Sequence, residues 1–208
     1  MEILKKIGRV IVRSAIYAYC KIVYKLQIIG KENVPKEDAV LFCGNHRTYL
    51  DPPLIVVTAG RHMRFMAKEE LAKNKFLAFL GIVFDAIYVK RDSKDITAMK
   101  EALKTLKNGG CVGLFPEGTR NGLEKNHGKL KNGAAYLALK TGAKIVPIGI
   151  QGDSKVFHKS IIVYGKPLDL SKYKEVKKID EQVENEVSEI LKNEIVRLSS
   201  DDVKKLKA

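Results

Sequence analysis

Residues 40–53 of this 208-residue chain read VLFCGNHRTYLDPP. The first four form a short apolar run that favours a β-strand, and Asp51 followed by two prolines is a typical start of a helix. A strand that passes through a short polar loop into a helix is the repeating unit of an α/β sheet. The segment therefore predicts an α/β fold in which a strand delivers His46 to a loop.

The same alternation continues along the chain. Besides the run at 39–43, β-rich runs occupy residues 26–29, 63–67, 86–89, 111–115, 144–150 and 160–164. Helical apolar spacing occurs between them at 96–106 and 130–141, and again at 180–198. We find no internal repeat and no linker. We therefore expect residues 26–208 to form one domain with a central, mixed β-sheet covered by helices.

Residues 1–25 have a different pattern, in which apolar residues recur at three- and four-residue spacing between Lys5, Lys6, Arg9 and Arg13. This is typical of a basic amphipathic helix, which can lie in the headgroup region of an anionic membrane. The alternative is a helix packed on the core of its own domain. The stretch is too interrupted by charge to span a bilayer, and it lacks the cleavage site of a signal peptide.

The net charge of +14 indicates a polyanionic partner. We favour an anionic membrane surface and expect no nucleic acid, because there is no tryptophan, no RNA-binding motif and no zinc-finger spacing. The three cysteines lie in apolar settings, which suits a reducing compartment, and the histidines lack ligand-like spacing. We expect no metal, no cofactor, and a peripheral protein on the cytoplasmic face of the cell membrane.

A first candidate for chemistry is the pair His46 and Asp51, which four residues separate. The loop can fold back so that Asp51 accepts a hydrogen bond from the imidazole, which leaves the other ring nitrogen free to act as a general base. The alternative is a helix N-cap at Asp51 beside a solvated histidine. Cys43 lies three residues earlier, and its apolar neighbours favour a buried core thiol over a nucleophile.

A second candidate follows the strand at 111–115, where the chain continues as Pro116-Glu117-Gly118-Thr119-Arg120. Gly118 admits unusual backbone angles, and Arg120 offers forked donors that suit a phosphate. Glu117 can accept hydrogen bonds from hydroxyl groups. The alternative is an ordinary turn with a surface ion pair.

Together these segments resemble the glycerolipid acyltransferase family, typified by the 1-acyl-sn-glycerol-3-phosphate (lysophosphatidic acid) acyltransferases. The four motif blocks of the family occur in order: Asn45-His46 with Asp51, Ile87-Tyr88-Val89-Lys90-Arg91, Phe115-Pro116-Glu117-Gly118-Thr119-Arg120, and Val146-Pro147-Ile148-Gly149-Ile150. One departure from the family pattern follows the third block, where the chain reads Leu130-Lys131-Asn132-Gly133. Lys129 and Lys131 keep the positive charge there.

The resemblance implies a role for each site residue. His46 would be the general base and Asp51 would orient it; the phosphoglycerol acceptor would be bound by Arg91, Glu117, Gly118, Thr119 and Arg120, with Pro147 as a wall of the site. The implied reaction moves an acyl chain from acyl-ACP or acyl-CoA to the sn-2 hydroxyl of 1-acyl-sn-glycerol-3-phosphate (lysophosphatidic acid), giving phosphatidic acid.

Three questions stay open at this point. The acceptor can instead be glycerol 3-phosphate or another lysophospholipid, because residues outside the motifs decide acceptor choice. A different class of function is a non-catalytic, cationic membrane-binding module. The continuously apolar run at 76–84 can form a buried helix, line an acyl-chain tunnel or touch the membrane.

Overall fold

The computed structural model describes residues 2–90, 95–121, 128–152, 157–173, 176 and 178–200, with side chains from Gly8 onward. The seven predicted strands are present, and each end lies within one residue of its predicted position. The strands are β1 (Gln27–Ile29), β2 (Val40–Gly44), β3 (Arg64–Lys68), β4 (Ile87–Val89), β5 (Cys111–Leu114), β6 (Lys144–Gln151) and β7 (Ile161–Tyr164).

The strands form one mixed sheet in the order β1-β7-β6-β2-β5-β3-β4. Only the β6–β7 pair is antiparallel within the described strands. Strand β2 lies between β5 and β6 and is parallel to both, with Val40 opposite Cys111 and Lys144. Because parallel neighbours end at the same edge of a sheet, the loops that follow β2 and β5 lie side by side. This topology brings the two candidate segments together.

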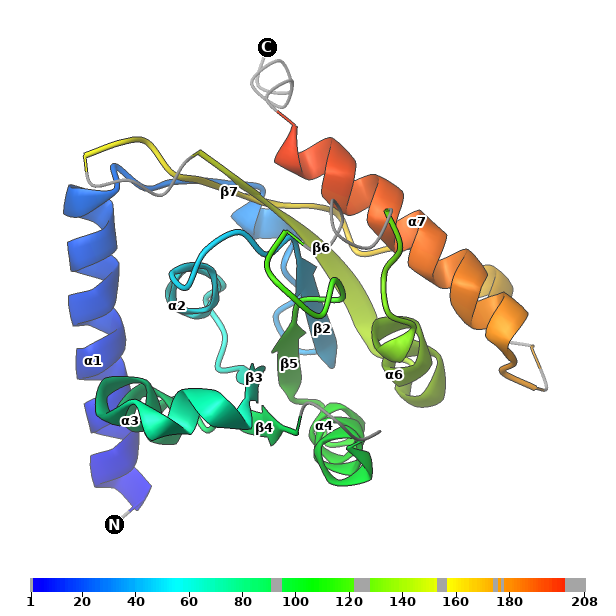
Figure 1. Ribbon diagram of the computed structural model, residues 1–208, viewed down its shortest axis with the longest axis horizontal. Coiled ribbons are helices and arrows are strands. Elements are labelled where there is room, and N and C mark those ends of the chain that lie inside the picture. Colours follow the sequence, from blue (N-terminus) through cyan, green and yellow to red (C-terminus); the bar gives the residue numbers. More distant parts are fainter. Residues whose placement is uncertain are drawn as a thin grey trace.

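Helices cover both faces of the sheet (Figure 1). Helices α1 (Glu2–Val23) and α2 (Asp51–Thr58) lie on one side, and α4 (Ile96–Lys107), α6 (Gly133–Thr141) and α7 (Glu181–Ser199) lie on the other. Helix α3 (Lys75–Val83) packs against α1, and the short 3-10 helices are η1 (Lys31–Asn33), η2 (Glu69–Lys73) and η3 (Ser171–Tyr173). The predicted single α/β domain is confirmed.

Two apolar cores result from this layering. The alternating side chains of β2 contribute to both, because Val40 and Phe42 face α1 and α2, whereas Leu41 and Cys43 face α4, α6 and α7. Every residue of β2 is buried. The strand that carries His46 at its end is therefore anchored on both faces and holds the following loop in a fixed place.

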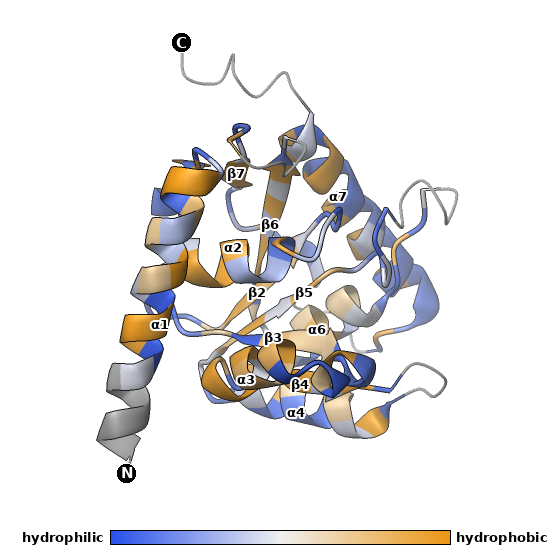
Figure 2. Ribbon diagram, turned by 60° about the vertical axis from the view of Figure 1, so that its left-hand side comes forward, coloured by the Kyte–Doolittle hydropathy of each residue, from blue (hydrophilic) through white to orange (hydrophobic). Residues whose placement is uncertain are grey.

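Helix α1 carries apolar residues along its length, as the orange segments of Figure 2 show. One face packs on the core with Val12, Ile16, Cys20 and Val23, so the core-packing alternative is right for this side of the helix. The other side of the helix leaves Val10, Ile11 and Ile22 exposed. Among the helices of the described residues, none is long and apolar enough to cross a bilayer.

Candidate active site

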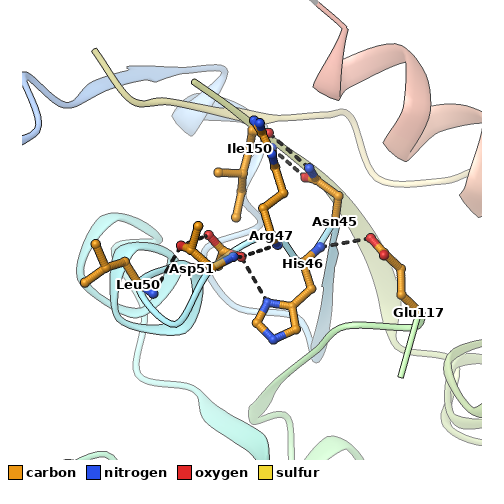
Figure 3. Close-up of polar contacts among 8 residues, drawn as sticks. Asn45, His46, Arg47, Leu50, Asp51, Glu117 and Ile150 are labelled. Carbon is orange, nitrogen blue, oxygen red and sulfur yellow. Dashed lines mark hydrogen bonds and ion pairs between the residues drawn. The ribbon is translucent and has the colours of Figure 1, made fainter. Parts of the chain in front are cut away.

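The centre of the candidate site is a hydrogen bond between His46 and Asp51 (Figure 3). Nδ1 of His46 lies 2.9 Å from Oδ2 of Asp51. The side chain of His46 is 18% exposed and that of Asp51 is 0% exposed. In the neutral ring, a carboxylate bound to Nδ1 favours the tautomer with its proton on Nδ1, and Nε2 is then the ring nitrogen that can accept a proton. This is the geometry that the spacing of the two residues predicted.

Asp51 is held by three further donors, all from the loop that precedes its own helix. Oδ2 accepts the backbone N–H groups of Arg47 and Thr48 at 2.6 and 2.7 Å, and Oδ1 accepts the Thr48 hydroxyl at 2.9 Å. Because α2 begins at Asp51 and its N-cap position is Leu50, the carboxylate does not cap the helix. The N-cap alternative for Asp51 is therefore wrong.

Two buried polar side chains, Glu117 and Asn45, bind the His46 loop to the neighbouring segments of the chain. Glu117, which is 2% exposed, accepts the backbone N–H of His46 at 2.9 Å. Asn45 forms a two-way bond with the backbone of Ile150 in β6, accepting its N–H at 2.7 Å and donating to its carbonyl at 3.0 Å. Glu117 thus positions the loop of the histidine, a contact that the sequence did not indicate.

The flat face of the imidazole lies on an aromatic ring. The His46 and Phe115 rings are stacked with centroids 4.0 Å apart and an angle of 3° between their planes. Phe115 in turn packs against Phe65 of β3, with centroids 5.0 Å apart. Asp51 restrains the imidazole in its plane and Phe115 restrains it from the side, so both ring rotations are limited.

The turn after β5 carries the cationic part of the site. The guanidinium of Arg120 lies over the ring of Tyr49, 3.8 Å from its centroid, which is a cation–π contact between the two candidate loops. Gly118 has φ +70°, and the side chain of Lys131 fills the space that a side chain at Gly118 would need. Thr119 is partly exposed. Arg120 belongs to this turn, and Lys131 contacts it at Gly118.

Two predicted residues have no observed place in this cluster. Arg91 lies outside the residues that the structure describes. Pro147 pairs with Cys43 in the middle of the sheet, and its ring lies against Gly165. Ile145, two residues before Pro147 in β6, lies in the core that α7 shares, so Pro147 is on the same face of the sheet. His46 lies in the loop that leads from β2 into α2. The predicted role of Pro147 as a wall of the site has no contact to support it among the described residues.

Cys43 is fully buried, and burial raises the pKa of its thiol well above the ordinary range. This confirms the prediction of a core thiol. The described residues contain no group of three or more His, Cys, Asp or Glu side chains that could hold a metal ion.

Four residues of the site were missed by reasoning from the sequence: Asn45, Thr48, Tyr49 and Phe115. Thr48 offered a usable signal, because a hydroxyl three residues before an aspartate often bonds to it in a tight loop. The other three bind partners that are distant in sequence.

An imidazole oriented by a buried carboxylate, next to the turn of Arg120 at the end of two parallel strands, has the geometry of an acid–base site in an α/β protein. The family model described as Acyltransferase matches residues 25–151. The 1-acyl-sn-glycerol-3-phosphate acyltransferase of Borreliella burgdorferi is 32% identical over 181 residues, which are 83% of this chain and 71% of that protein. The Bacillus subtilis enzyme of the same name is 31% identical, over 69% of this chain and 73% of its own. The chain belongs to the acyltransferase family, which confirms the resemblance of its motifs.

Other relatives are longer. The chloroplastic protein LPAT1 of Arabidopsis thaliana is 30% identical over 64% of this chain, but the match covers 38% of that protein. Among solved structures, the 1-acyl-sn-glycerophosphate acyltransferase of Thermotoga maritima superposes with a TM-score of 0.62 at 22% identity. The superposition covers 94% of this chain and 98% of that one, and it supports the fold.

Proposed function

We propose that this protein transfers a fatty acyl chain from an acyl thioester to the sn-2 hydroxyl of 1-acyl-sn-glycerol-3-phosphate, giving phosphatidic acid. The observation that carries the proposal is the 2.9 Å bond from Nδ1 of His46 to the buried carboxylate of Asp51. It leaves Nε2 as the nitrogen that meets a substrate hydroxyl. The names of the curated relatives supply the substrate class.

The reaction needs no covalent acyl-enzyme. Nε2 of His46 accepts the proton of the glycerol hydroxyl while the oxygen forms a bond to the thioester carbonyl carbon. The carbon–sulfur bond then breaks, and the imidazolium returns its proton to the leaving thiolate. Asp51 stabilises the imidazolium that exists between the two transfers, because its negative charge lies in direct contact with the ring.

The acceptor phosphate is the natural ligand of the cationic turn. Arg120 offers paired N–H donors, and Lys131 adds a second positive charge beside Gly118. We assign Arg91, Thr119 and the backbone at Gly118 to the same acceptor site on the resemblance alone. Glu117 holds the His46 loop with one carboxylate oxygen, and binding of a glycerol hydroxyl remains a prediction for this side chain.

We also propose that residues 1–25 attach the protein to an anionic membrane and that residues 26–208 carry the reaction. The exposed face of α1 supports this, because Val10, Ile11 and Ile22 remain uncovered after the opposite face has packed on the core. The three buried cysteines are free, which suits a reducing compartment and hence the cytoplasmic face of the cell membrane. The donor can be acyl-ACP or acyl-CoA, since both are anionic and the protein carries +14.

The test is an incubation of the purified protein with each donor and with lysophosphatidic acid, glycerol 3-phosphate and a neutral lysophospholipid in competition. Mass spectrometry of the products should show phosphatidic acid as the main product. Acylation of glycerol 3-phosphate alone would keep the chemistry and change the acceptor. Vesicle binding without any acylated product would contradict the enzyme and leave the non-catalytic membrane module.

A further inference from the structure

Helix α3 is apolar along its whole length after Lys75, yet none of its residues is buried. Phe76, Phe79 and Ile82 are 66%, 50% and 76% exposed. These positions are three residues apart, so they lie along one side of the helix. The sequence left open a buried helix for this run, and the structure shows that this alternative is wrong.

Three contacts fix the orientation of α3. Asn74 accepts the N–H groups of Phe76 and Leu77 at 3.0 and 3.1 Å and so caps the helix. Leu80 and Val83 pack toward the core that α1 and α2 share. The Tyr88 side chain lies so close to Gly81 that no side chain fits there. The exposed side is therefore a defined surface and not the result of a loosely held helix.

Helix α3 packs against α1, which also carries exposed apolar side chains. Figure 2 shows orange segments on both helices. We call the combined surface the α1–α3 face; its exposed apolar members are Val10, Ile11, Ile22, Phe76, Phe79 and Ile82. A water-soluble surface seldom exposes this many large apolar side chains on two neighbouring helices, so the face is expected to meet a partner.

Charge identifies the kind of partner. Lys73 and Lys75 are exposed at the start of α3, and Lys21 and Lys25 are exposed near the end of α1. An apolar centre with lysines at its border fits a bilayer, where apolar side chains enter the acyl region and ammonium groups meet anionic headgroups. A second copy of this chain would bring the same lysines against each other, which opposes self-association.

We infer that α3 is a second membrane-contacting element, which inserts Phe76, Phe79 and Ile82 into an anionic bilayer beside α1. Contacts through both α1 and α3 determine the tilt of the domain on the membrane, whereas contact through α1 alone would leave the domain free to rotate about the axis of that helix. Arg13 of α1 donates to the Val57 carbonyl near the end of α2, and α2 begins with Asp51. The membrane-facing helix is thus in contact with the helix that carries the catalytic carboxylate. The inference rests on the proposed function only in taking the substrate to be a membrane lipid.

The absence of tryptophan from the sequence gives a direct test. Phe79→Trp places a single fluorophore on the α1–α3 face, and Val196→Trp places one on α7 at a site of similar exposure. With vesicles of phosphatidylcholine and phosphatidylglycerol, Phe79→Trp should show a blue-shifted emission and quenching by brominated acyl chains. Val196→Trp should show neither. Ile82→Trp repeats the measurement at the far end of the same face.

A companion test measures sedimentation with the same vesicles. Phe76→Ser combined with Phe79→Ser should lower vesicle affinity about tenfold or more, and Val196→Ser should change it by less than about twofold. Unshifted emission of Phe79→Trp while the protein sediments with vesicles would overturn the inference. A blue shift without vesicles that grows with protein concentration would also overturn it, in favour of a second copy. Neither the fluorescence nor the sedimentation measurement uses a substrate, so their results are independent of the test of acyl transfer.

Discussion

Asp51→Asn separates the charge of the carboxylate from its role in holding the loop. The N–H groups of Arg47 and Thr48, at 2.6 and 2.7 Å, require an acceptor at the Oδ2 position. The asparagine oxygen must therefore occupy this position and its NH₂ group must face the Thr48 hydroxyl, which can accept. His46 still finds an acceptor for Nδ1–H, so the imidazole keeps its tautomer. The negative charge is removed, and the bond between Thr48 and residue 51 reverses its direction.

The size of the effect follows from this geometry. A charge-assisted hydrogen bond is worth about 1–2 kcal/mol more than a neutral one. Partial burial of the pair adds a further Coulombic contribution. We therefore expect Asp51→Asn to destabilise the state with a protonated imidazole by about 3 kcal/mol in total. Because about 1.4 kcal/mol corresponds to a factor of ten, kcat should fall about 10²-fold.

The assay compares initial rates of phosphatidic acid formation with urea unfolding of the same preparations. Asp51→Asn should unfold within about 1–2 kcal/mol of the unchanged protein, because His46 and the two backbone N–H groups keep their acceptor and only the Thr48 hydroxyl loses one. Asp51→Ala should lose about 2–4 kcal/mol of stability, since it leaves two backbone N–H groups without their acceptor. A transfer rate for Asp51→Asn within about threefold of the unchanged protein would refute the electrostatic role of the carboxylate. Equal instability of the two variants would refute the geometric argument.

Three further predictions concern contacts that hold the site. Asn45→Ala removes both bonds to the β6 backbone and should lower the urea unfolding free energy by about 2–4 kcal/mol; a loss below about 1 kcal/mol would contradict this. Phe115→Leu frees the stacked face of His46, so kcat should fall about tenfold with little change in acceptor KM, and a change confined to KM would speak against positioning. Tyr49→Leu should raise the KM for the phosphate acceptor about two- to fivefold through Arg120, whereas Tyr49→Phe keeps the ring and should stay within about twofold.

The fold was largely predictable because its signals are local. Each strand is a short β-rich run between turn residues, and β2 and β5 are apolar throughout because both of their faces are covered. The pairing of His46 with Asp51 was also local, since the two residues are five positions apart. A loop this short leaves few ways for the imidazole and the carboxylate to meet.

The rest of the site depends on partners that only the folded chain brings together. Asn45 and Ile150 are 105 positions apart, and His46 and Glu117 are 71 positions apart. Nothing local indicates that Glu117 also accepts the backbone N–H of His46, and its role in substrate binding stays a prediction. The two apolar faces of α1 share one helical pattern, and only the position of the core shows which face remains exposed.

The most direct test of the proposed reaction is the rate of acyl transfer to lysophosphatidic acid by His46→Ala, with phosphatidic acid measured by mass spectrometry. His62→Ala, outside the site, serves as the matched control. Loss of the general base should lower the rate about 10³-fold or more while urea unfolding stays nearly unchanged. A rate for His46→Ala within about tenfold of the control would contradict the assignment of His46 as the base that activates the glycerol hydroxyl.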